Sequence, residues 1–213
     1  MPEAIHKTLA KTAYARYTDK GSRFYAHAYP VMDQKTIEHR RSELAVTYPD
    51  ATHHCYAWRF NPFNLQEYAQ DDGEPAGTAG LPILGVIKSE ELVNVLIIVV
   101  RYFGGTKLGK PGLVQAYREA ATLSVAAARK TAIDRFIPFR ITYPYEQENR
   151  ICELINRYRL ETDDEQYLEF VTMTLFCKAD LASSMYGILE HLSHLGISFR
   201  QLPECFRPVD FPE

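Results

Sequence analysis

The second part of the chain alternates between strand-like and helix-like patterns of apolar residues. Residues 136–145 alternate apolar and polar side chains and are rich in aromatic residues, as strands are. The next segment, EQENRICELINRYR, carries apolar residues at the spacing of one helical face, at Ile151, Leu154, Ile155 and Tyr158. The pattern continues with a strand near Leu160, a strand over 167–177, a helix with Asp180 as N-cap and Gly196 at its end, and a last strand over 197–202. This βαββαβ order predicts a ferredoxin-like domain.

The first part of the chain mixes strands with longer helices. Strand-like stretches around 12–17 and 23–29 flank the turn TDKGS, and a helical pattern covers 33–46. Residues 93–103 are nearly all apolar and β-branched, which indicates a strand covered on both faces. The remaining elements are strands over 53–60 and 65–70, a glycine-interrupted helix over 76–87, a helix from 111 to about 130, and a short linker near 132–136. The whole predicts an α+β protein with two domains, 1–135 and 136–213.

Composition restricts the class of protein. The chain has 213 residues, of which 46% are hydrophobic and 24% charged, an ordinary globular composition that excludes a disordered or fibrous protein. Its longest apolar stretch, 92–100, is far shorter than the roughly 20 residues of a membrane helix. The N-terminus has no apolar core of the kind that marks a secretory signal. We therefore expect a cytoplasmic protein with no membrane partner.

The four cysteines, Cys55, Cys152, Cys177 and Cys205, contain no C-x-x-C pair. This spacing argues against a zinc knuckle or a thioredoxin-type site, and we expect reduced thiols. Cys55 is interpreted as a small hydrophobic core residue.

Charge is distributed unevenly along the chain. The net charge is −3, but residues 1–135 carry 17 basic and 14 acidic side chains, whereas the rest carries 7 and 13. Between Arg101 and Lys130 there are six basic residues and a single acidic one, Glu119. The basic character of the first domain is thus concentrated in one segment.

That segment, VVRYFGGTKLGKPGLVQAYREAA, reads as a buried strand, a glycine loop and a helix. Gly104, Gly105 and Gly109 permit conformations in which the backbone approaches a ligand closely. The amides of a helix N-terminus form a ready anion site, to which Arg101, Lys107 and Lys110 add positive charge. The alternative is a tight turn beside a solvated helix face. The coincidence of loop, helix start and charge of one sign favours contact with phosphate or nucleic acid.

A P-loop is a weaker interpretation of the same residues. The stretch from Gly104 to Lys110 fits G-x-x-x-x-G-K, but Pro111 stands where a P-loop needs Ser or Thr to hold magnesium.

A second group of polar residues could form a site. Asp71, Asp72 and Glu74 follow a predicted strand, and paired carboxylates can bind a metal or act as acid and base, although turn formation is the commoner role. His53 and His54 are adjacent on a strand, so their side chains should face opposite sides and cannot both hold one ion. One of the two histidines could complete a polar site beside the acidic loop.

Three segments carry a family resemblance: HHCYAWRF, DDGEPAGTAGLPIL and RYFGGTKLGKPGLVQAY. They resemble the hallmark stretches of the YigZ/IMPACT family, in its bacterial two-domain type, over much of residues 20–130. The resemblance implies an N-terminal domain similar to the second domain of ribosomal protein S5 and a C-terminal ferredoxin-like domain similar to those of elongation factor G.

The resemblance also bears on function. Eukaryotic relatives regulate translation by binding an activator of a kinase that phosphorylates initiation factor 2. They do so through an additional N-terminal domain that we expect this chain to lack, so this partner is not expected here. The bacterial members have no established enzyme activity, so no catalytic residue is carried over, and no cofactor or metal is expected.

Three hypotheses follow. The leading one is a non-catalytic, translation-associated protein that binds RNA or the ribosome. Arg101, Lys107 and Lys110 would contact phosphates, and the three loop glycines would let the protein backbone approach them closely. The second is an enzyme acting on a phosphorylated small molecule or nucleotide, with His53, His54, Asp71, Asp72 and Glu74 near the loop. The third is a protein-interaction module that binds a protein partner through the acidic C-terminal domain.

Overall fold

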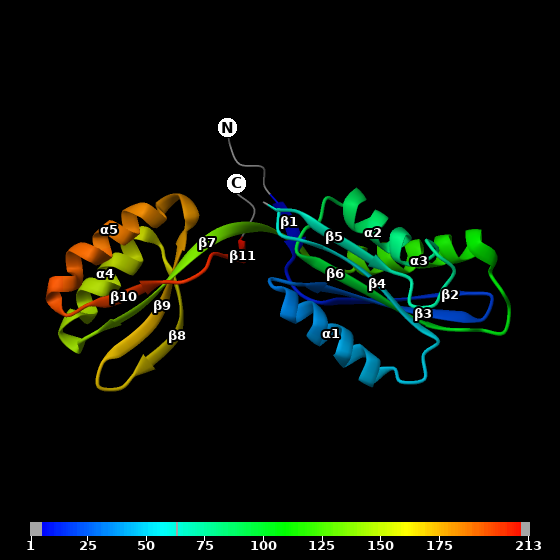
Figure 1. Cartoon of the computed structure of the whole chain (residues 1–213), viewed down its shortest axis with the longest axis horizontal. Coiled ribbons are helices and arrows are strands. Elements are labelled where there is room, and N and C mark those ends of the chain that lie inside the picture. Colours follow the sequence, from blue (N-terminus) through cyan, green and yellow to red (C-terminus); the bar gives the residue numbers. More distant parts are fainter. Residues whose placement is uncertain (1–5, 63, 210–213) are drawn as a thin grey trace. The chain divides into compact units, whose positions relative to one another are not determined.

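The chain forms two compact units in the computed structural model, which describes residues 6–62 and 64–209 (Figure 1). The first unit comprises Met1–Ile133 with Pro208–Glu213, and the second comprises Asp134–Arg207. Both units are mixed α/β structures, as the predicted fold class requires. Among the described residues, no helix is both long and apolar enough to cross a membrane.

Strand β7 (Lys130–Tyr143) begins in the first unit and ends in the second. Its first four residues pair with β1 (His6–Leu9), and residues 136–143 pair with β9 (Val171–Lys178). The division between the two units, between Ile133 and Asp134, falls within the linker predicted near 132–136, but this linker is not a loop. These residues belong to a strand that is hydrogen-bonded along most of its length.

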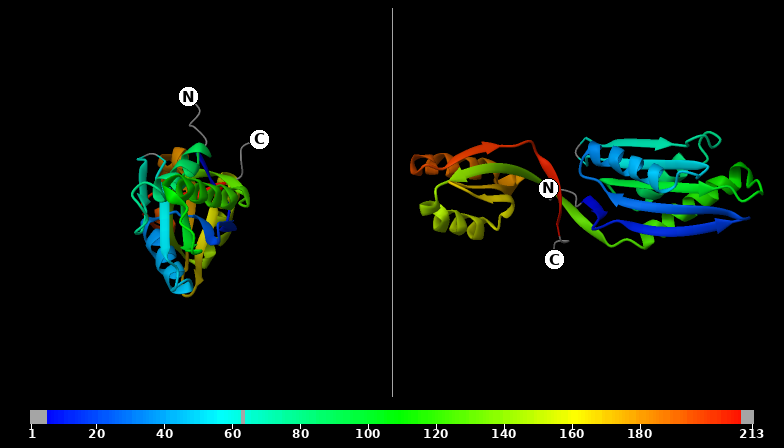
Figure 2. Two further views of the ribbon diagram at one scale, coloured as in Figure 1. Left: turned by 90° about the vertical axis from the view of Figure 1, so that its right-hand side faces the viewer. Right: turned by 90° about the horizontal axis from the view of Figure 1, so that it is seen from below.

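The first unit is built on a five-stranded antiparallel sheet with the order β2-β3-β6-β4-β5. Its strands are β2 (Ala13–Asp19), β3 (Ser22–Pro30), β4 (His53–Phe60), β5 (Gln66–Gln70) and β6 (Val95–Tyr102). Helices α2 (Gly80–Ser89) and α3 (Gly109–Ala126) cover one face, and α1 (Gln34–Thr47) covers part of the other (Figures 1 and 2). The unit therefore has a hydrophobic core on each side of its sheet.

Strand β6 lies at the centre of this sheet and is buried on both faces, as its apolar pattern predicts. The odd-numbered residues from Val95 to Val99 pack against α2 and α3, and the even-numbered residues from Leu96 to Val100 pack on the face of α1. Each of these side chains is at most 1% exposed. The strand is antiparallel to both neighbours, so its continuous apolar run reflects burial on two sides and not a parallel sheet.

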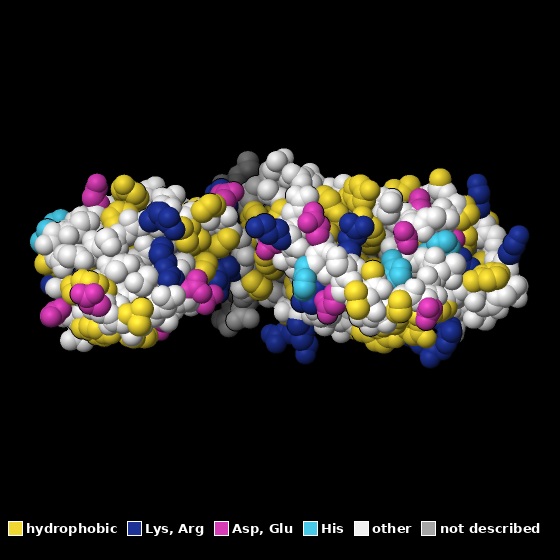
Figure 3. All heavy atoms as spheres, turned by 60° about the horizontal axis from the view of Figure 1, so that its bottom comes forward, with side chains coloured by type: hydrophobic (Ala, Val, Ile, Leu, Met, Phe, Trp, Pro, Cys, Tyr) yellow, Lys and Arg dark blue, Asp and Glu magenta, His cyan; other side chains and the backbone are white. Residues whose placement is uncertain are grey.

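The face that carries α1 is only partly covered by that helix. Ile37 and Leu44 are the buried residues of α1, and they pack among Tyr29, Tyr56 and the apolar side chains of β6. Figure 3 views the molecule from the side on which α1 lies, and charged side chains of both signs are interspersed with hydrophobic ones over this surface. Part of the sheet beside α1 is open to solvent, because Tyr14, Arg16 and Arg23 on this face are exposed.

Two helix boundaries in the first unit differ from the predicted ones. Helix α2 begins at Gly80 and not at residue 76, because residues 71–79 form a loop organised by Asp71. Helix α3 ends at Ala126, and Lys130, the predicted helix end, is the first residue of β7.

The second unit has the predicted βαββαβ order. Its elements are β7, α4 (Glu148–Tyr158), β8 (Glu161–Tyr167), β9, α5 (Ala182–Leu192) and β10 (Ser198–Gln201). The strands lie in the order β10-β7-β9-β8, and all neighbours are antiparallel. The two helices contribute Ile151, Leu154, Met185 and Leu189 to one core with the sheet.

The predicted strand over 167–177 and the predicted cap of the last helix need correction. Residues 161–167 form the separate edge strand β8, and β9 begins only at Val171. The strand predicted near Leu160 corresponds to β8, but because β8 is mostly exposed and polar, no apolar alternation marks its bounds. Asp180 does not cap α5: a short 3₁₀ turn, Ala179–Leu181, precedes the helix, whose N-cap residue is Leu181. Gly196 does end the helical segment, with a positive φ of 79°.

Candidate functional site

A buried carboxylate, Glu74, lies at the centre of a group of polar side chains between the sheet and α3. Its Oε1 accepts a short hydrogen bond from Nη1 of Arg101 and a 2.8 Å hydrogen bond from the hydroxyl of Tyr117. All three residues are buried. Burial is the main cause that raises the pKa of Tyr117 well above its ordinary value, so the phenol remains a protonated donor. The charge of Glu74 is thus neutralised by Arg101 inside the protein.

His53 and Cys55 extend this cluster along β4. Nε2 of His53 lies 3.8 Å from Oε1 of Glu74, and Nδ1 lies 2.7 Å from the carbonyl oxygen of Asp72. Sγ of Cys55 lies 2.9 Å from the carbonyl oxygen of Asp71 and 3.2 Å from the Tyr117 hydroxyl. Burial raises the pKa of the Cys55 thiol well above its ordinary value, so this thiol is neutral and a poor nucleophile.

Asp71 organises the loop that carries Glu74. Its carboxylate accepts backbone hydrogen bonds from Gly77 at 2.8 Å, Ala79 at 3.0 Å and Gly80 at 2.8 Å, and it thereby caps the start of α2. Burial alone would raise the pKa of Asp71, but these three hydrogen bonds outweigh it and hold the pKa below its ordinary value of 3.8. Asp71 is therefore a structural residue that fixes the position of Glu74.

Replacing Asp71 by Asn should cost about 1–2 kcal/mol of unfolding free energy at pH 7, since an amide cannot accept all three N–H groups. Because the folded-state pKa of Asp71 is lowered, its stabilisation is present above about pH 4 and is lost as the pH falls through the folded-state pKa. Urea unfolding of wild type and variant between pH 7 and pH 2.5 measures this difference. A difference that stays constant over this pH range would contradict the role given to Asp71.

The cluster reaches the glycine loop through Ser22, a residue with no exposed surface. Nη2 of Arg101 lies 3.4 Å from Oγ of Ser22, and the backbone N–H of Gly104 donates to the same oxygen at 3.2 Å. His53, Asp71 and Glu74 therefore do converge beside the glycine loop. Asp72 faces elsewhere: its carboxylate accepts a 2.6 Å hydrogen bond from the backbone N–H of His54.

The glycine loop itself is divided into a packed part and an open part. A Cβ on Gly104 would lie 1.9 Å from the carbonyl carbon of Gly21, so this glycine serves the contact with the β2–β3 turn. Gly105, with φ of 87°, has no atom within 4 Å of a Cβ position, and Gly109, with φ of 70°, begins α3. The N-cap residue of α3, Leu108, makes no side-chain capping hydrogen bond, so within the described part of the chain the amides of the first turn are left for water or a ligand.

The basic residues of this segment have two different environments. Arg101 and Lys130 are ion-paired with Glu74 and Glu90, whereas Lys107 and Lys110 are exposed and make no ion pair with any described residue. The sequence predicts that Arg101 contacts phosphate together with the two lysines, but the structure places its guanidinium in the interior, paired with Glu74. The charge available to a ligand at the loop therefore comes from the two lysines. Pro111 is the third residue of α3.

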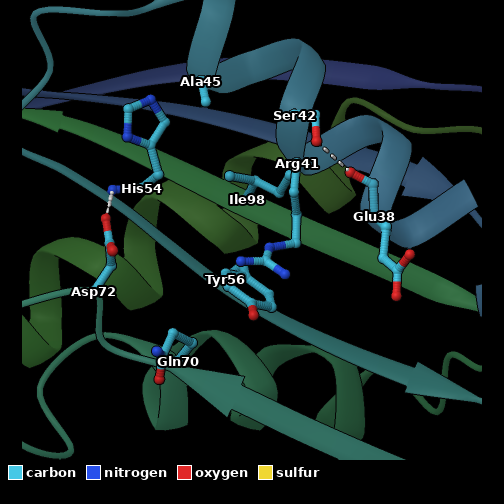
Figure 4. A pocket seen from close by; sticks show the side chains of 9 residues that line it. All are labelled: Glu38, Arg41, Ser42, Ala45, His54, Tyr56, Gln70, Asp72 and Ile98. Carbon is cyan, nitrogen blue, oxygen red and sulfur yellow. Dashed lines mark hydrogen bonds between the residues drawn. The ribbon is translucent and has the colours of Figure 1, made fainter. Parts of the chain in front are cut away.

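His54 faces the opposite side of the sheet from His53, as their adjacent positions predict. It lines a pocket of about 340 Å³ on the side of α1, together with Arg41, Tyr56 and Asp72 (Figure 4). The guanidinium of Arg41 lies over the ring of Tyr56, 4.2 Å from its centre. Nε2 of His54 is buried and has no hydrogen-bond partner among the described residues. The predicted polar group is thus split by the sheet into two separate sets.

Sequence reasoning missed Tyr117 and Ser22 as members of the cluster. Tyr117 belongs to the apolar face of α3, and Ser22 is the first residue of β3, so neither carries a sequence signal of its own. Among the described residues, no group of three or more His, Cys, Asp or Glu side chains could hold a metal ion.

Comparisons with known proteins find a family for this chain. The model of the Impact N-terminal domain matches residues 20–125. An IMPACT family member from Thermus thermophilus is 36% identical over 72% of this chain and 83% of its own length, and the IMPACT family member YigZ from Escherichia coli is 35% identical over 72% and 76%. A crystal structure described as that of a hypothetical protein shares the fold, with a TM-score of 0.66, 24% identity, and coverage of 93% of this chain and 98% of that one. The chain belongs to the IMPACT family.

Proposed function

We propose that this protein is a non-catalytic, cytoplasmic regulator of translation that binds RNA or the ribosome through the glycine loop and the start of α3. The observation that carries the proposal is the environment of Lys107 and Lys110. Both lysines are exposed and free of ion pairs with described residues, and they lie on either side of Gly109, where α3 begins without a side-chain cap from its N-cap residue Leu108. Cations beside open backbone amides form a surface suited to phosphate groups.

The Glu74 cluster supports this proposal as a scaffold. It neutralises its own charges, and it holds Gly104 through Ser22, so the open part of the loop rests on a rigid base. The raised pKa values of Cys55 and Tyr117 keep both groups neutral, as expected for a structural network and not for a nucleophile or a general base. The link to translation rests on the resemblance to eukaryotic relatives that regulate it.

Replacing both Lys107 and Lys110 by Ala should weaken RNA binding roughly 20-fold at 0.1 M salt. Each phosphate contact with a single strand contributes about 0.7 to the slope of log affinity against log salt, so the slope should fall by about 1.4. Titration of a fluorescently labelled RNA at several salt concentrations gives both quantities, and co-sedimentation with ribosomes at low salt tests the larger partner.

The matched control is Lys11→Ala, an exposed lysine that precedes β2 in the chain and should leave affinity and slope unchanged. The proposal is wrong if the wild-type protein neither binds RNA nor sediments with ribosomes at low salt. It is equally wrong if the double variant retains the wild-type slope.

One observation favours a second candidate, an enzyme acting on a phosphorylated small molecule. His53 is partly exposed and lies 3.8 Å from Glu74, close to a loop suited to phosphate. A thermal-shift screen with nucleotides and sugar phosphates, with and without divalent metal, tests it. A ligand that raises the melting temperature of wild type but not of His53→Ala would support it, and a screen without any such ligand would reject it.

A further inference from the structure

The open part of the sheet beside α1 carries six residues that we call the tyrosine–arginine face: Tyr14, Arg16, Arg23, Tyr25, Tyr48 and Tyr102. Cross-strand pairing places them on one side of the sheet, since Arg16 pairs with Tyr25 and Arg23 pairs with Tyr102. Tyr48 joins them from the end of α1. The solvent side of an antiparallel sheet usually carries small polar or charged residues, so this density of rings is unusual.

The rings of this face form a connected array. Tyr25 is at its centre, stacked on Tyr48 with centroids 5.7 Å apart and on Tyr14 at 6.4 Å, and edge-on to Tyr102 at 5.9 Å. Tyr14 is 48% exposed, so much of its ring is free at the surface. Next to it, burial lowers the pKa of His27 to about 4, so this histidine is neutral at physiological pH and bonds to the Tyr48 hydroxyl. The array is thus preorganised, and part of it is open.

The two arginines supply the charge of the face. The guanidinium of Arg16 lies 5.6 Å from the ring centre of Tyr25, and that of Arg23 lies 5.2 Å from the ring centre of Tyr102. Both side chains are exposed, and within the described part of the chain neither forms an ion pair. No acidic residue of β2, β3 or β6 faces this side, because β2 and β3 place Tyr, Arg, Thr and His here and β6 places Leu, Ile, Val and Tyr. The face therefore complements a polyanion that also presents flat rings.

The face is continuous with the glycine loop. Tyr102 ends β6 two residues before Gly104, and Gly104 packs on Gly21, which is two residues before Arg23. Phe103 lies between Tyr102 and Gly104 in the chain and is 48% exposed. One end of the sheet therefore brings together Arg23, Tyr102 and the loop that carries the two exposed lysines.

We propose that the tyrosine–arginine face binds single-stranded RNA, with unpaired bases stacked on Tyr14 and its neighbouring rings and the backbone phosphates held by Arg16 and Arg23. This inference rests on the proposed RNA binding and names the form of RNA that is recognised. Aromatic platforms flanked by cations bind single strands because every base has a face that can stack, whereas the bases of a duplex are already stacked on each other.

The test compares Tyr14→Ala with Tyr14→Phe in the full chain. The probes are a labelled single-stranded RNA of about 12 nucleotides without self-complementarity, and the same sequence as a duplex. Tyr14→Ala should weaken binding of the single strand roughly 5- to 150-fold, whereas Tyr14→Phe, which keeps the ring, should stay within about twofold of wild type. Duplex binding and the salt slope should not change, because neither depends on stacking.

Tyr186→Ala, an equally accessible aromatic residue of the second unit, is the matched control and should have no effect. Crosslinking of wild-type protein to RNA containing 4-thiouridine provides a readout without any substitution, and adducts are expected on peptides from β2 and β3. If Tyr14→Ala binds as wild type does while the Lys107/Lys110 double variant is weakened, this inference is overturned and the proposed function stands. If the wild type binds no RNA, both fail.

Discussion

Replacing Glu74 by Gln is expected to lower the free energy of unfolding of the first unit by about 3–5 kcal/mol. The side chains of Glu74 and Arg101 are only 3% and 6% exposed, and they form an ion pair between the sheet and α3. Gln keeps the size of the side chain but not its charge, so the guanidinium of Arg101 would stay buried without a counter-charge. Urea unfolding followed by the fluorescence of Trp58 measures the effect, since this is the only tryptophan of the chain and belongs to β4 in the first unit.

The matched control is Glu91→Gln, which breaks a surface pair with Lys7. The side chains of Glu91 and Lys7 are 75% and 41% exposed, so loss of this pair should lower the free energy of unfolding by less than about 1 kcal/mol. The double variant Glu74→Gln with Arg101→Gln should recover part of the loss, because no charge is then left buried. Equal urea midpoints for Glu74→Gln and wild type would show that the buried pair does not stabilise the unit.

Replacing Gly104 by Ala is expected to cost at least about 3 kcal/mol or to force the glycine loop away from the β2–β3 turn. An added Cβ would lie 1.9 Å from the carbonyl carbon of Gly21 and 2.1 Å from the backbone nitrogen of Ser22. Both atoms belong to the backbone of a tight turn, where Lys20 and Gly21 have positive φ values of 44° and 80°. The backbone of the turn cannot move aside as a flexible side chain would, so the glycine loop has to shift to relieve the clash. Urea unfolding and RNA titration of the same variant measure stability and loop position together.

Gly85→Ala is the matched control. Gly85 is exposed within α2, and no atom lies within 4 Å of its Cβ position. Alanine should stabilise the helix there by about 0.5–1 kcal/mol, because glycine loses more backbone entropy on folding. If both alanine variants had the same stability, the close packing of Gly104 on Gly21 would not be a structural requirement.

The spacing of apolar residues along the chain correctly predicted those elements that bury their own side chains in a regular pattern. The β6 strand and the helices of the second unit are of this kind, since each of them buries a regular stripe of its own side chains. It predicted a strand near Leu160 but not the bounds of β8, because this edge strand is built from Glu, Thr, Asp and Gln side chains and is held by its pairing with β9. It placed the start of α2 too early, because the carboxylate of Asp71 shapes the intervening loop from a distance of up to nine residues.

Charge counting along the chain was informative only in part. The sum of six cations between Arg101 and Lys130 treats each one as exposed, but Glu74 neutralises Arg101 from 27 residues away and Glu90 neutralises Lys130 from 40 residues away. Such pairs follow from tertiary packing and leave no local pattern. The sequence suggested that His53, Asp71 and Glu74 could lie close together. Their separate roles could not be predicted, because these depend on hydrogen bonds between residues far apart in the chain. The S5-like and elongation-factor-like similarities stay predictions.

The strand β11 (Cys205–Val209) has a consequence for the order in which the protein folds. It pairs with β7, and the hydroxyl of Thr131 donates to the carbonyl oxygen of Val209 at 2.6 Å. During synthesis, β7 leaves the ribosome before the whole second unit, and its partner β11 leaves after it. At typical rates of elongation the interval is roughly 4–15 s, far longer than the formation of a hairpin. One strand edge of the first unit therefore stays open while the second unit is made, and the closing of this edge is a late step in the folding of the nascent chain.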